Sequence, residues 1–264
     1  MYDAFPDLPA IYDSVPAYIA RRDTQFYLDE ARDAGGSILE VGCGTGRVLL
    51  PVARSGRQVY GLDASHQMLE RCQAKLTNEP SIVRSRVSLR QGDARAFDLG
   101  RQFDLVIAPF RVVQHLTTIE DQLGFLESAA RHLAPGGRLT FDVFNPNFAA
   151  LASADGSERE DTPDTTLPDG RSFRRAGRFT RVRWIDQVSE IELIYYISRE
   201  PGGIADRHVQ SFDMRWFLRA ELVHLLARGG FQVRSIYGDF DRSPLTDKSP
   251  EQIVCAERVR PAAT

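Results

Sequence analysis

Residues 37–47 read SILEVGCGTGR, and they are the most informative stretch of this chain. The apolar run at 38–41 is short, which is typical of a strand buried on both faces of a sheet. Gly42, Gly44 and Gly46 follow at once, and glycine permits backbone angles and close approaches that a Cβ atom would prevent. A helical pattern begins directly after them, so the unpaired N–H groups of its first turn face the same loop. The stretch predicts a strand, a glycine turn and a helix arranged around a bound ligand.

The three glycines have the spacing G-x-G-x-G, which separates two classes of ligand. The fingerprint for dinucleotides is G-x-G-x-x-G, and its third glycine lets the helix pack closely on the strand. Arg47 stands where that third glycine would fall. The spacing therefore counts against a nicotinamide dinucleotide. An NAD-dependent oxidoreductase remains an alternative, because it shares the strand, turn and helix of this start.

Strands and helices continue to alternate beyond this turn. Strand-like apolar runs occupy residues 59–63, 87–93, 103–110 and 138–144, and helical spacing of apolar residues occupies 48–53, 68–76 and 119–133. Ser65 is the expected N-cap of the second helix, and Gly56 is the expected end of the first. Strands separated by helices of this length predict right-handed crossovers and a mostly parallel sheet that helices cover on both faces.

The clearest helix of the chain is expected at residues 119–133. Its apolar positions recur at spacings of three and four, which predicts one continuous apolar face. A Pro-Gly-Gly sequence at 135–137 would end it. The predicted face consists of Ile119, Leu123, Leu126, Ala130 and Leu133.

The alternation stops after Pro146. Residues 148–172 are rich in small and polar residues and are interpreted as an irregular connection. Three strand-like runs come next, at 173–185, 189–198 and 207–217, with a Pro-Gly-Gly turn at 201–203. No helical pattern separates these runs, so they should pair antiparallel. Helical spacing returns at 222–226, and two final strands are expected at 231–237 and 252–257.

These patterns predict one α/β domain that carries an insertion. The domain would be Rossmann-like, with a seven-stranded, mostly parallel sheet, and would comprise residues 1–147 and 218–264. Residues 1–36 would form a helical cover. Residues 148–217 would form an inserted antiparallel β subdomain that serves the substrate or acts as a lid.

Composition narrows the class of protein. The net charge of −3 gives no reason to expect nucleic acid or a membrane surface as a partner. No apolar run approaches the ~20 residues that span a bilayer, and no secretory signal is visible. Cys43, Cys72 and Cys255 lie far apart, which counts against a zinc site and a secreted disulfide scaffold. We therefore expect a cytoplasmic protein without a bound metal.

Residues 40–46 resemble the first motif of the class I methyltransferases that use S-adenosylmethionine (SAM). Four further segments match that family in the same order: GLDAS at 61–65, QGDA at 91–94, FDLV at 103–106 and LAPGGRL at 133–139. The five matches cover residues 37–144. The inserted β segment also resembles that of small-molecule methyltransferases of the glycine and amino-sugar N-methylating type. The resemblance implies SAM as cofactor, a small-molecule acceptor, an antiparallel last strand and a homodimer.

The resemblance also implies where the nucleoside part of the cofactor binds. Asp63 ends the second strand, and its carboxylate would accept hydrogen bonds from the ribose hydroxyls. Asp93 would hold the adenine amino group, and the backbone N–H of Ala94 would meet the ring. Ala64 and Met68 would flank the adenine. The alternative for both aspartates is a cap on the following helix, and the alternative for Met68 is a core position.

The methionine part of the cofactor would lie at the other end of this site. Glu40 and the backbone near Gly42 and Ala108 would face it, beside the remaining glycines, Gly44 and Gly46. The alternative for Glu40 is a carboxylate held by the backbone at the end of its strand.

The segment after the fourth strand is the expected place for residues that face the acceptor. It reads PFRVVQHL at 109–116, without the Asn/Asp-Pro-Pro-aromatic signature of enzymes that methylate exocyclic amines of bases or glutamine. His115 could act as a catalytic general base, because imidazole titrates near neutrality. The alternative is a histidine packed beside the helix start. Arg111 could hold an acidic group of the acceptor, and the alternative is a solvated cation of the loop.

The segment at 11–22 precedes the first strand, and similar methyltransferases fold such a segment over the cofactor. Tyr12 and Tyr18 could line the substrate pocket, and Arg21 or Arg22 could pair with the SAM carboxylate. The alternative is a surface helix with packed aromatic residues.

Arginines recur between residues 171 and 183, in one strand of the insertion. Since no RNA-binding module is recognisable, they are interpreted as a solvated sheet face. Regular alternation along the strand would place Arg175, Arg181 and Arg183 on one face and Arg174 and Arg178 on the other.

Methyl transfer from SAM is an in-line displacement whose leaving group is already activated. The protein therefore mainly aligns the nucleophile and shields the site, which explains why no catalytic triad is visible. The sequence predicts a SAM-dependent methyltransferase with a small-molecule acceptor, whose accepting atom is nitrogen, oxygen or carbon. The alternative is a noncatalytic SAM-binding protein, which would share every cofactor motif.

Overall fold

The computed structural model of the chain describes residues 3–199, 203 and 205–259. The contacts within the chain divide it into two compact units. The larger comprises Arg22–Pro146 and Trp216–Thr264, and the smaller comprises Met1–Arg21 and Asn147–Arg215. The smaller unit thus takes in the first 21 residues, which the sequence pattern had grouped with the Rossmann-like domain.

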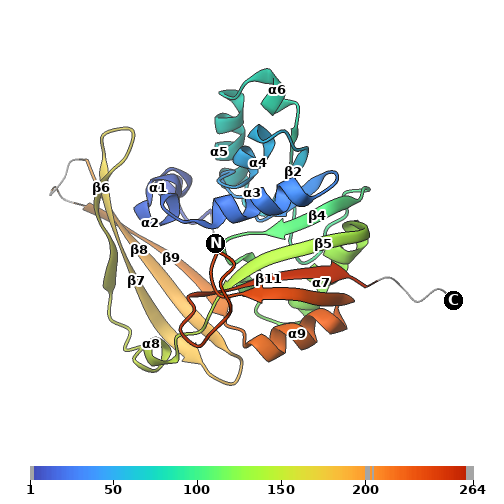
Figure 1. Cartoon of the computed structure of the whole chain (residues 1–264). Coiled ribbons are helices and arrows are strands. Elements are labelled where there is room, and N and C mark those ends of the chain that lie inside the picture. Colours follow the sequence, from blue (N-terminus) through green and yellow to red (C-terminus); the bar gives the residue numbers. More distant parts are fainter. Residues whose placement is uncertain (1–2, 200–202, 204, 260–264) are drawn as a thin grey trace. The chain divides into compact units, whose positions relative to one another are not determined.

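The described residues of the larger unit contain seven strands: β1 (Ile38–Val41), β2 (Val59–Asp63), β3 (Val87–Gln91), β4 (Phe103–Ala108), β5 (Leu133–Phe144), β10 (Phe231–Tyr237) and β11 (Glu251–Arg258). They form one sheet in the order β10-β11-β5-β4-β1-β2-β3 (Figure 1). The first five strands pair parallel with one another. β11 pairs antiparallel with both β5 and β10. The predicted fold class, including the antiparallel last strand, is confirmed.

Helices cover both faces of this sheet. α3 (Asp23–Asp33), α4 (Leu49–Arg54) and α5 (His66–Thr77) pack on one face, and α7 (Ile119–His132) and α9 (Arg219–Arg228) pack on the other (Figure 1). Two short elements, α6 (Ser81–Arg84) and the 3-10 helix η1 (Val112–His115), lie in connections. The Ser65 hydroxyl caps α5 by accepting a hydrogen bond from the N–H of Met68 at 3.1 Å, as predicted.

The buried face of α7 differs from the predicted one. Ile119 is 50% exposed, whereas Phe125 and Ala129 are fully buried in the sheet core. Gln122 also points inward, where its amide donates to the carbonyl of Leu116 at 2.8 Å. Of the predicted face, Leu126 and Leu133 are buried as expected, whereas the prediction is wrong for Ile119. Two sets of residues recur at helical spacing, and packing against the sheet rotates the buried face toward the second set.

The smaller unit contains a four-stranded antiparallel sheet in the order β6-β7-β8-β9. Its strands are β6 (Arg159–Thr166), β7 (Ser172–Arg183), β8 (Val188–Ser198) and β9 (Ala205–Arg215). The three predicted strands and their antiparallel pairing are confirmed. Of the turn predicted at 201–203, only Gly203 lies within the described residues. α1 (Leu8–Ser14) and α2 (Pro16–Ile19) cover one face of this sheet, where Ile11 and Val15 join a core with Phe173 and Tyr195.

β6 and the short helix α8 (Phe148–Ala152) lie where an irregular connection was expected. β6 reads REDTPDTT, and only Thr162 in it is buried. It is an edge strand that pairs with β7 alone, and Pro163 lies within it. An edge strand whose side chains face water carries no alternating apolar pattern, so its sequence gave no strand signal.

The arginines of β7 are distributed differently from the prediction. The register between β7 and β8 shifts at residues 179–181, which marks a β-bulge. One extra residue exchanges the faces of every residue beyond it. The predicted split is therefore wrong for the last two arginines, and Arg175 stands alone on its face. The other face carries Arg174, Arg178, Arg181 and Arg183.

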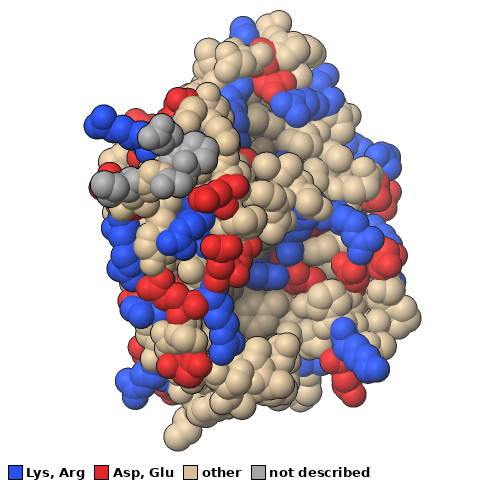
Figure 2. Space-filling view, turned by 90° about the vertical axis from the view of Figure 1, so that its left-hand side faces the viewer, with Lys and Arg blue, Asp and Glu red and all other residues tan. Residues whose placement is uncertain are grey.

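Acidic side chains pair with the arginines of this sheet. Arg178 lies 2.6 Å from Glu192, and Arg183 lies 3.2 Å from Asp213. Figure 2 shows basic and acidic side chains intermixed over the face in view. A nucleic-acid surface needs a field of one sign, and this pairing does not provide one along β7.

Candidate functional site

The glycine turn after β1 adopts backbone angles that favour glycine. The angle φ is +72° at Gly42, +53° at Gly44 and +83° at Gly46. A Cβ atom at Gly42 would lie 2.3 Å from Cγ2 of Val112, and one at Gly46 would lie 2.7 Å from the sulfur of Cys72. A Cβ atom at Gly44 would meet no atom of the described structure within 4 Å. The outer glycines therefore serve packing, and the middle one faces open space.

Asp63 lies beside this turn, at the end of β2. Its Oδ2 accepts a hydrogen bond from the N–H of Gly44 at 2.7 Å, and its Oδ1 accepts one from the N–H of Ser65 at 2.8 Å. These two bonds fix the orientation of the carboxylate at the carboxyl end of the sheet. Since Ser65 is the N-cap of α5, the alternative that Asp63 caps this helix is wrong.

Glu40 is buried on β1, and its Oε2 accepts no hydrogen bond from the described residues. Loss of hydration raises the pKa of this carboxyl group well above its usual range, although nearby Arg47 acts in the opposite direction. A buried carboxyl oxygen without a partner is unfavourable. If the backbone held this carboxylate, Oε2 would have a hydrogen-bond partner. The oxygen instead suits a ligand that brings a hydrogen-bond donor or a cation.

The residue that interrupts the dinucleotide fingerprint has a structural role. Arg47 donates two hydrogen bonds to Asp23 of α3, each 2.6 Å long, and Asp23 is fully buried. A bidentate pair of this kind fixes both distance and orientation. The guanidinium of Arg47 also lies 5.2 Å from the ring centre of Phe110. Arg47 thus links the glycine turn to α3 and to the loop after β4.

The residues expected around the adenine lie at the ends of β2 and β3. Asp93 is 44% exposed, and Nε of Arg95 donates to it at 2.9 Å. This hydrogen bond from Arg95 lowers the pKa of the Asp93 carboxyl group. The alternative that Asp93 caps a helix is wrong, because residues 92–102 contain no helix. Met68 is buried in α5, Ala64 is exposed, and Ala94 packs partly on the core; their contacts with adenine stay predictions.

The loop after β4 has an unusual backbone. β4 ends at the buried Ala108, and the angle φ is +59° at Phe110 and +69° at Arg111. The guanidinium of Arg111 donates to Oε1 of Glu251 at 3.0 Å, so Arg111 is not a solvated loop cation. His115 is half-buried at the end of η1. The roles of Arg111 toward an acidic acceptor and of His115 as a base stay predictions.

Three buried residues that the sequence patterns did not single out hold this loop. Oδ1 of Asp142 accepts hydrogen bonds from the N–H of Phe110 at 2.8 Å and from the hydroxyl of Tyr27 at 2.6 Å. Oε1 of Gln114 accepts one from the N–H of Phe144 at 2.9 Å. The available signal was an acid inside the apolar strand FDVF, but its tyrosine partner stands 115 residues away in the chain.

Tyr12 and Tyr18 belong to the smaller unit, where their ring centres lie 5.0 Å apart. The hydroxyl of Tyr18 accepts a hydrogen bond from Nη1 of Arg175 at 2.7 Å. Arg175 is buried and also donates to Asp161 at 2.8 Å, so it is not part of a solvated face. The place of the two tyrosines in a substrate pocket stays a prediction. Arg22 donates to Asp239 at 2.9 Å.

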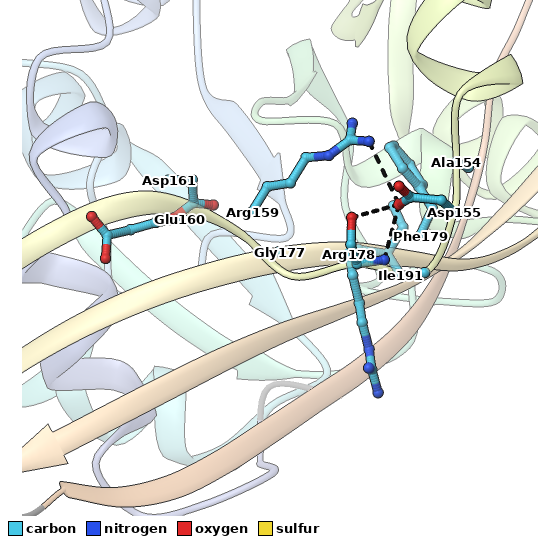
Figure 3. Close-up of a pocket in the computed structure, with 11 residues that line it drawn as sticks. Ala154, Asp155, Arg159, Glu160, Asp161, Gly177, Arg178, Phe179 and Ile191 are labelled. Atoms are coloured by element: carbon cyan, nitrogen blue, oxygen red, sulfur yellow. Dashed lines mark hydrogen bonds and ion pairs between the residues drawn. The ribbon is translucent and has the colours of Figure 1, made fainter.

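The smaller unit also contains a cavity of about 260 Å³ (Figure 3). Phe179 of β7 and Ile191 of β8 are among its apolar lining residues. Arg159 points toward Asp155 at the rim, and the two form an ion pair at 3.6 Å. Glu160, Asp161 and Arg178 also line the cavity, so its wall contains both apolar and charged side chains.

No group of three or more His, Cys, Asp or Glu side chains that could hold a metal ion occurs in residues 3–199, 203 and 205–259. Within the same residues, no helix has the length and apolar character needed to cross a membrane. The three cysteines are buried free thiols.

Comparison with known proteins places the chain in a known family. Residues 38–137 match the family described as "Methyltransferase domain". The chain is 33% identical, over 203 residues, to the dTDP-3-amino-3,4,6-trideoxy-alpha-D-glucopyranose N,N-dimethyltransferase of Streptomyces venezuelae. That match covers 76% of this chain and 78% of the relative.

Two of the similar solved structures match about nine tenths or more of the chain. The CcbJ methyltransferase from Streptomyces caelestis has a TM-score of 0.77 at 23% identity, with 96% of each chain covered, and this likeness concerns the fold. CalS10, an amino pentose methyltransferase from Micromonospora echinaspora solved with SAM bound, has a TM-score of 0.64 at 27% identity. The match covers 89% of this chain and 90% of CalS10.

Proposed function

Because this chain belongs to the family of SAM-dependent methyltransferases, we propose that it transfers the methyl group of SAM to the amino group of a small molecule, such as an amino sugar. The observation that carries this proposal is the bond between Asp63 and Gly44 beside open space at the carboxyl end of the sheet. Ligands of open α/β sheets bind at that end. The name of the Streptomyces venezuelae relative, an amino-sugar N,N-dimethyltransferase, supports an amine as acceptor.

The residues at this edge fit SAM chemically. SAM supplies a methyl group on a positively charged sulfur, already activated for transfer. Glu40, whose Oε2 is buried without a hydrogen bond, would accept from the amino group of the methionine part. The ribose hydroxyls would donate to Asp63, and Asp93 with Ala94 would hold the adenine. Gly44 leaves room for a ligand close to the backbone.

His115 is proposed to take a proton from the acceptor. A protonated amine has no lone pair with which to attack a methyl group, so one proton must leave first. A ring nitrogen of a neutral His115 would accept that proton. η1 places His115 just after β4, at the same edge of the sheet as the glycine turn.

Isothermal titration tests the cofactor. We expect saturable binding of SAM and of its product S-adenosylhomocysteine (SAH), and no competition by NAD, because Arg47 is held by Asp23 where the dinucleotide fingerprint needs glycine. Saturable NAD binding in the absence of SAM binding would contradict the proposal. Mass spectrometry distinguishes an enzyme from a noncatalytic SAM-binding protein, because only an enzyme forms methylated products from SAM and a panel of amino sugars.

His115→Ala tests the proton acceptor. We expect kcat with the best amino acceptor of that panel to fall about a hundredfold or more, since a positioned base contributes on that order. The affinity for SAM should change little, because the cofactor side of the site is intact. The measurement pairs initial rates with melting curves taken with and without SAH. A less stable variant with normal turnover and normal stabilisation by SAH would make His115 a packing residue.

We propose that the enzyme is cytoplasmic. Its three free thiols support this localisation, because the cytoplasm keeps cysteines reduced. We propose no nucleic-acid acceptor, since acidic residues pair with the arginines of β7. A homodimer remains part of the proposal, and sedimentation velocity measures it directly.

A further inference from the structure

We propose that Asp142 and Tyr27 are positioning residues, which hold the turn after β4 in the shape that receives the amino-acid end of SAM. The inference rests on the proposed function, because it takes the carboxyl edge of β1 and β4 as the place of the methionine part. Neither residue is assigned a ligand contact; both act through the backbone of Phe110.

The turn is strained. Phe110 and Arg111 are neighbours, and both have positive φ angles. Left-handed backbone is unfavourable for residues with a Cβ atom, and it persists where the surrounding structure holds it. The other non-glycine residues with positive φ in the described chain, Gln187 and Arg242, stand singly. Two in succession at the end of a central strand therefore call for an explanation.

Asp142 is the residue that holds this backbone. It has no exposed surface, and its Oδ1 accepts both the N–H of Phe110 at 2.8 Å and the hydroxyl of Tyr27 at 2.6 Å. Hydrogen bonds to a carboxylate are stronger than those between neutral groups. Tyr27 is itself fully buried on α3, so it fixes the carboxylate from the side of the helix.

The turn after β4 transmits this constraint to the glycine turn after β1. Val112 follows Arg111 and packs on Gly42 so closely that a Cβ atom there would lie 2.3 Å from Cγ2 of Val112. A contiguous path therefore runs from Asp142 of β5, through Phe110 and Val112, to the end of β1. If the bond to Phe110 is lost, the wall beside Gly42 and Ala108 is free to relax.

Sheet order limits this effect to one end of the cofactor. The strands lie in the order β5-β4-β1-β2-β3. Asp142 and Phe110 lie on the β5 and β4 side of β1, whereas Asp63 and Asp93, proposed for the ribose and adenine, lie on the β2 and β3 side. Disturbing Asp142 should therefore weaken contacts with the amino-acid part of the ligand and spare those with the nucleoside.

The experiment compares two ligands by isothermal titration. SAH contains the amino-acid part, whereas 5′-methylthioadenosine has the same nucleoside and sulfur but lacks it. Tyr27→Phe, which removes one hydroxyl and keeps the buried ring, and Asp142→Asn, which keeps the shape, should each weaken SAH binding about tenfold. Binding of 5′-methylthioadenosine should stay within about twofold of the unaltered protein. A loss of overall stability would affect both ligands alike, so the ratio of the two affinities would stay the same.

Tyr196→Phe is the matched control. Its hydroxyl also donates to a carboxylate oxygen, that of Glu158, at the same 2.6 Å, but on the inserted sheet. It should leave both affinities unchanged. Equal losses for the two ligands, or no loss of SAH affinity in folded Tyr27→Phe and Asp142→Asn, would overturn the assignment. If the unaltered chain binds neither ligand, the proposed function fails and this inference fails with it.

Discussion

Replacing Asp63 with alanine is expected to weaken SAH binding about tenfold or more, because each lost hydrogen bond from a ribose hydroxyl to the carboxylate is worth roughly 1.5–3 kcal/mol. The same substitution also removes the acceptor of the Gly44 and Ser65 N–H groups, so the glycine turn loses its anchor. Isothermal titration of SAH measures the effect, and a melting curve shows that the variant is folded.

Asp98→Ala is the matched control for this prediction. Asp98 lies in the same unit as Asp63. Its Oδ1 accepts a hydrogen bond from the N–H of Gly100 at 2.9 Å, and this bond spans two residues, like the bond from Ser65 to Asp63. It has no place in the proposed site, so its loss should change SAH affinity by less than about twofold. Unchanged affinity in a folded Asp63→Ala variant would remove Asp63 from the cofactor site.

Gly44→Ala is expected to abolish most of the affinity for SAH while the protein stays folded. An alanine at φ +53° has a strained backbone, which costs about 1–2 kcal/mol, and its methyl group meets no described atom within 4 Å. The fold can therefore accept it. The methyl group projects into the space proposed for the cofactor, so we expect affinity to fall about tenfold or more, measured by titration of SAH.

Gly100→Ala separates backbone strain from obstruction of the site. Gly100 also has a positive φ, +62°, and a Cβ atom there also meets nothing described within 4 Å. The two variants should lose similar amounts of stability, and only Gly44→Ala should lose SAH affinity. Equal affinities in both variants would place the ligand elsewhere than above the glycine turn.

Much of the larger unit was predictable because its signals act over a few residues. A glycine with positive φ, a serine that caps a helix and an apolar run that ends in a turn are all local preferences. Gly42 and Gly44 have backbone angles of the kind that glycine was expected to permit, and Ser65 caps α5 as predicted. The order of strands and helices along the chain then restricts the sheet to a few topologies.

Three features of the fold were less predictable. β6 has one buried residue, Thr162, so no apolar pattern marks it as a strand. The bulge in β7 adds one residue and moves Arg181 and Arg183 to the other face. No local pattern in the sequence predicts this bulge. In α7, packing against the sheet buries Phe125 and leaves Ile119 half exposed. The pairing of β6 with β7 and the bulge against β8 arise from backbone hydrogen bonds between neighbouring strands, and the buried face of α7 arises from packing against the sheet; no apolar pattern in the sequence records any of the three.

The sequence alone was sufficient for the glycine turn, for the acids at the ends of β1 and β2, and for the class of ligand they suggest. Folding determined which buried polar groups meet: Tyr27 with Asp142, and Arg47 with Asp23. A buried carboxylate must find a donor, but local pattern does not say which one. Sheet order and register bring Tyr27 and Asp142 together across 115 residues of chain, and these depend on the packing of all the strands and helices at once.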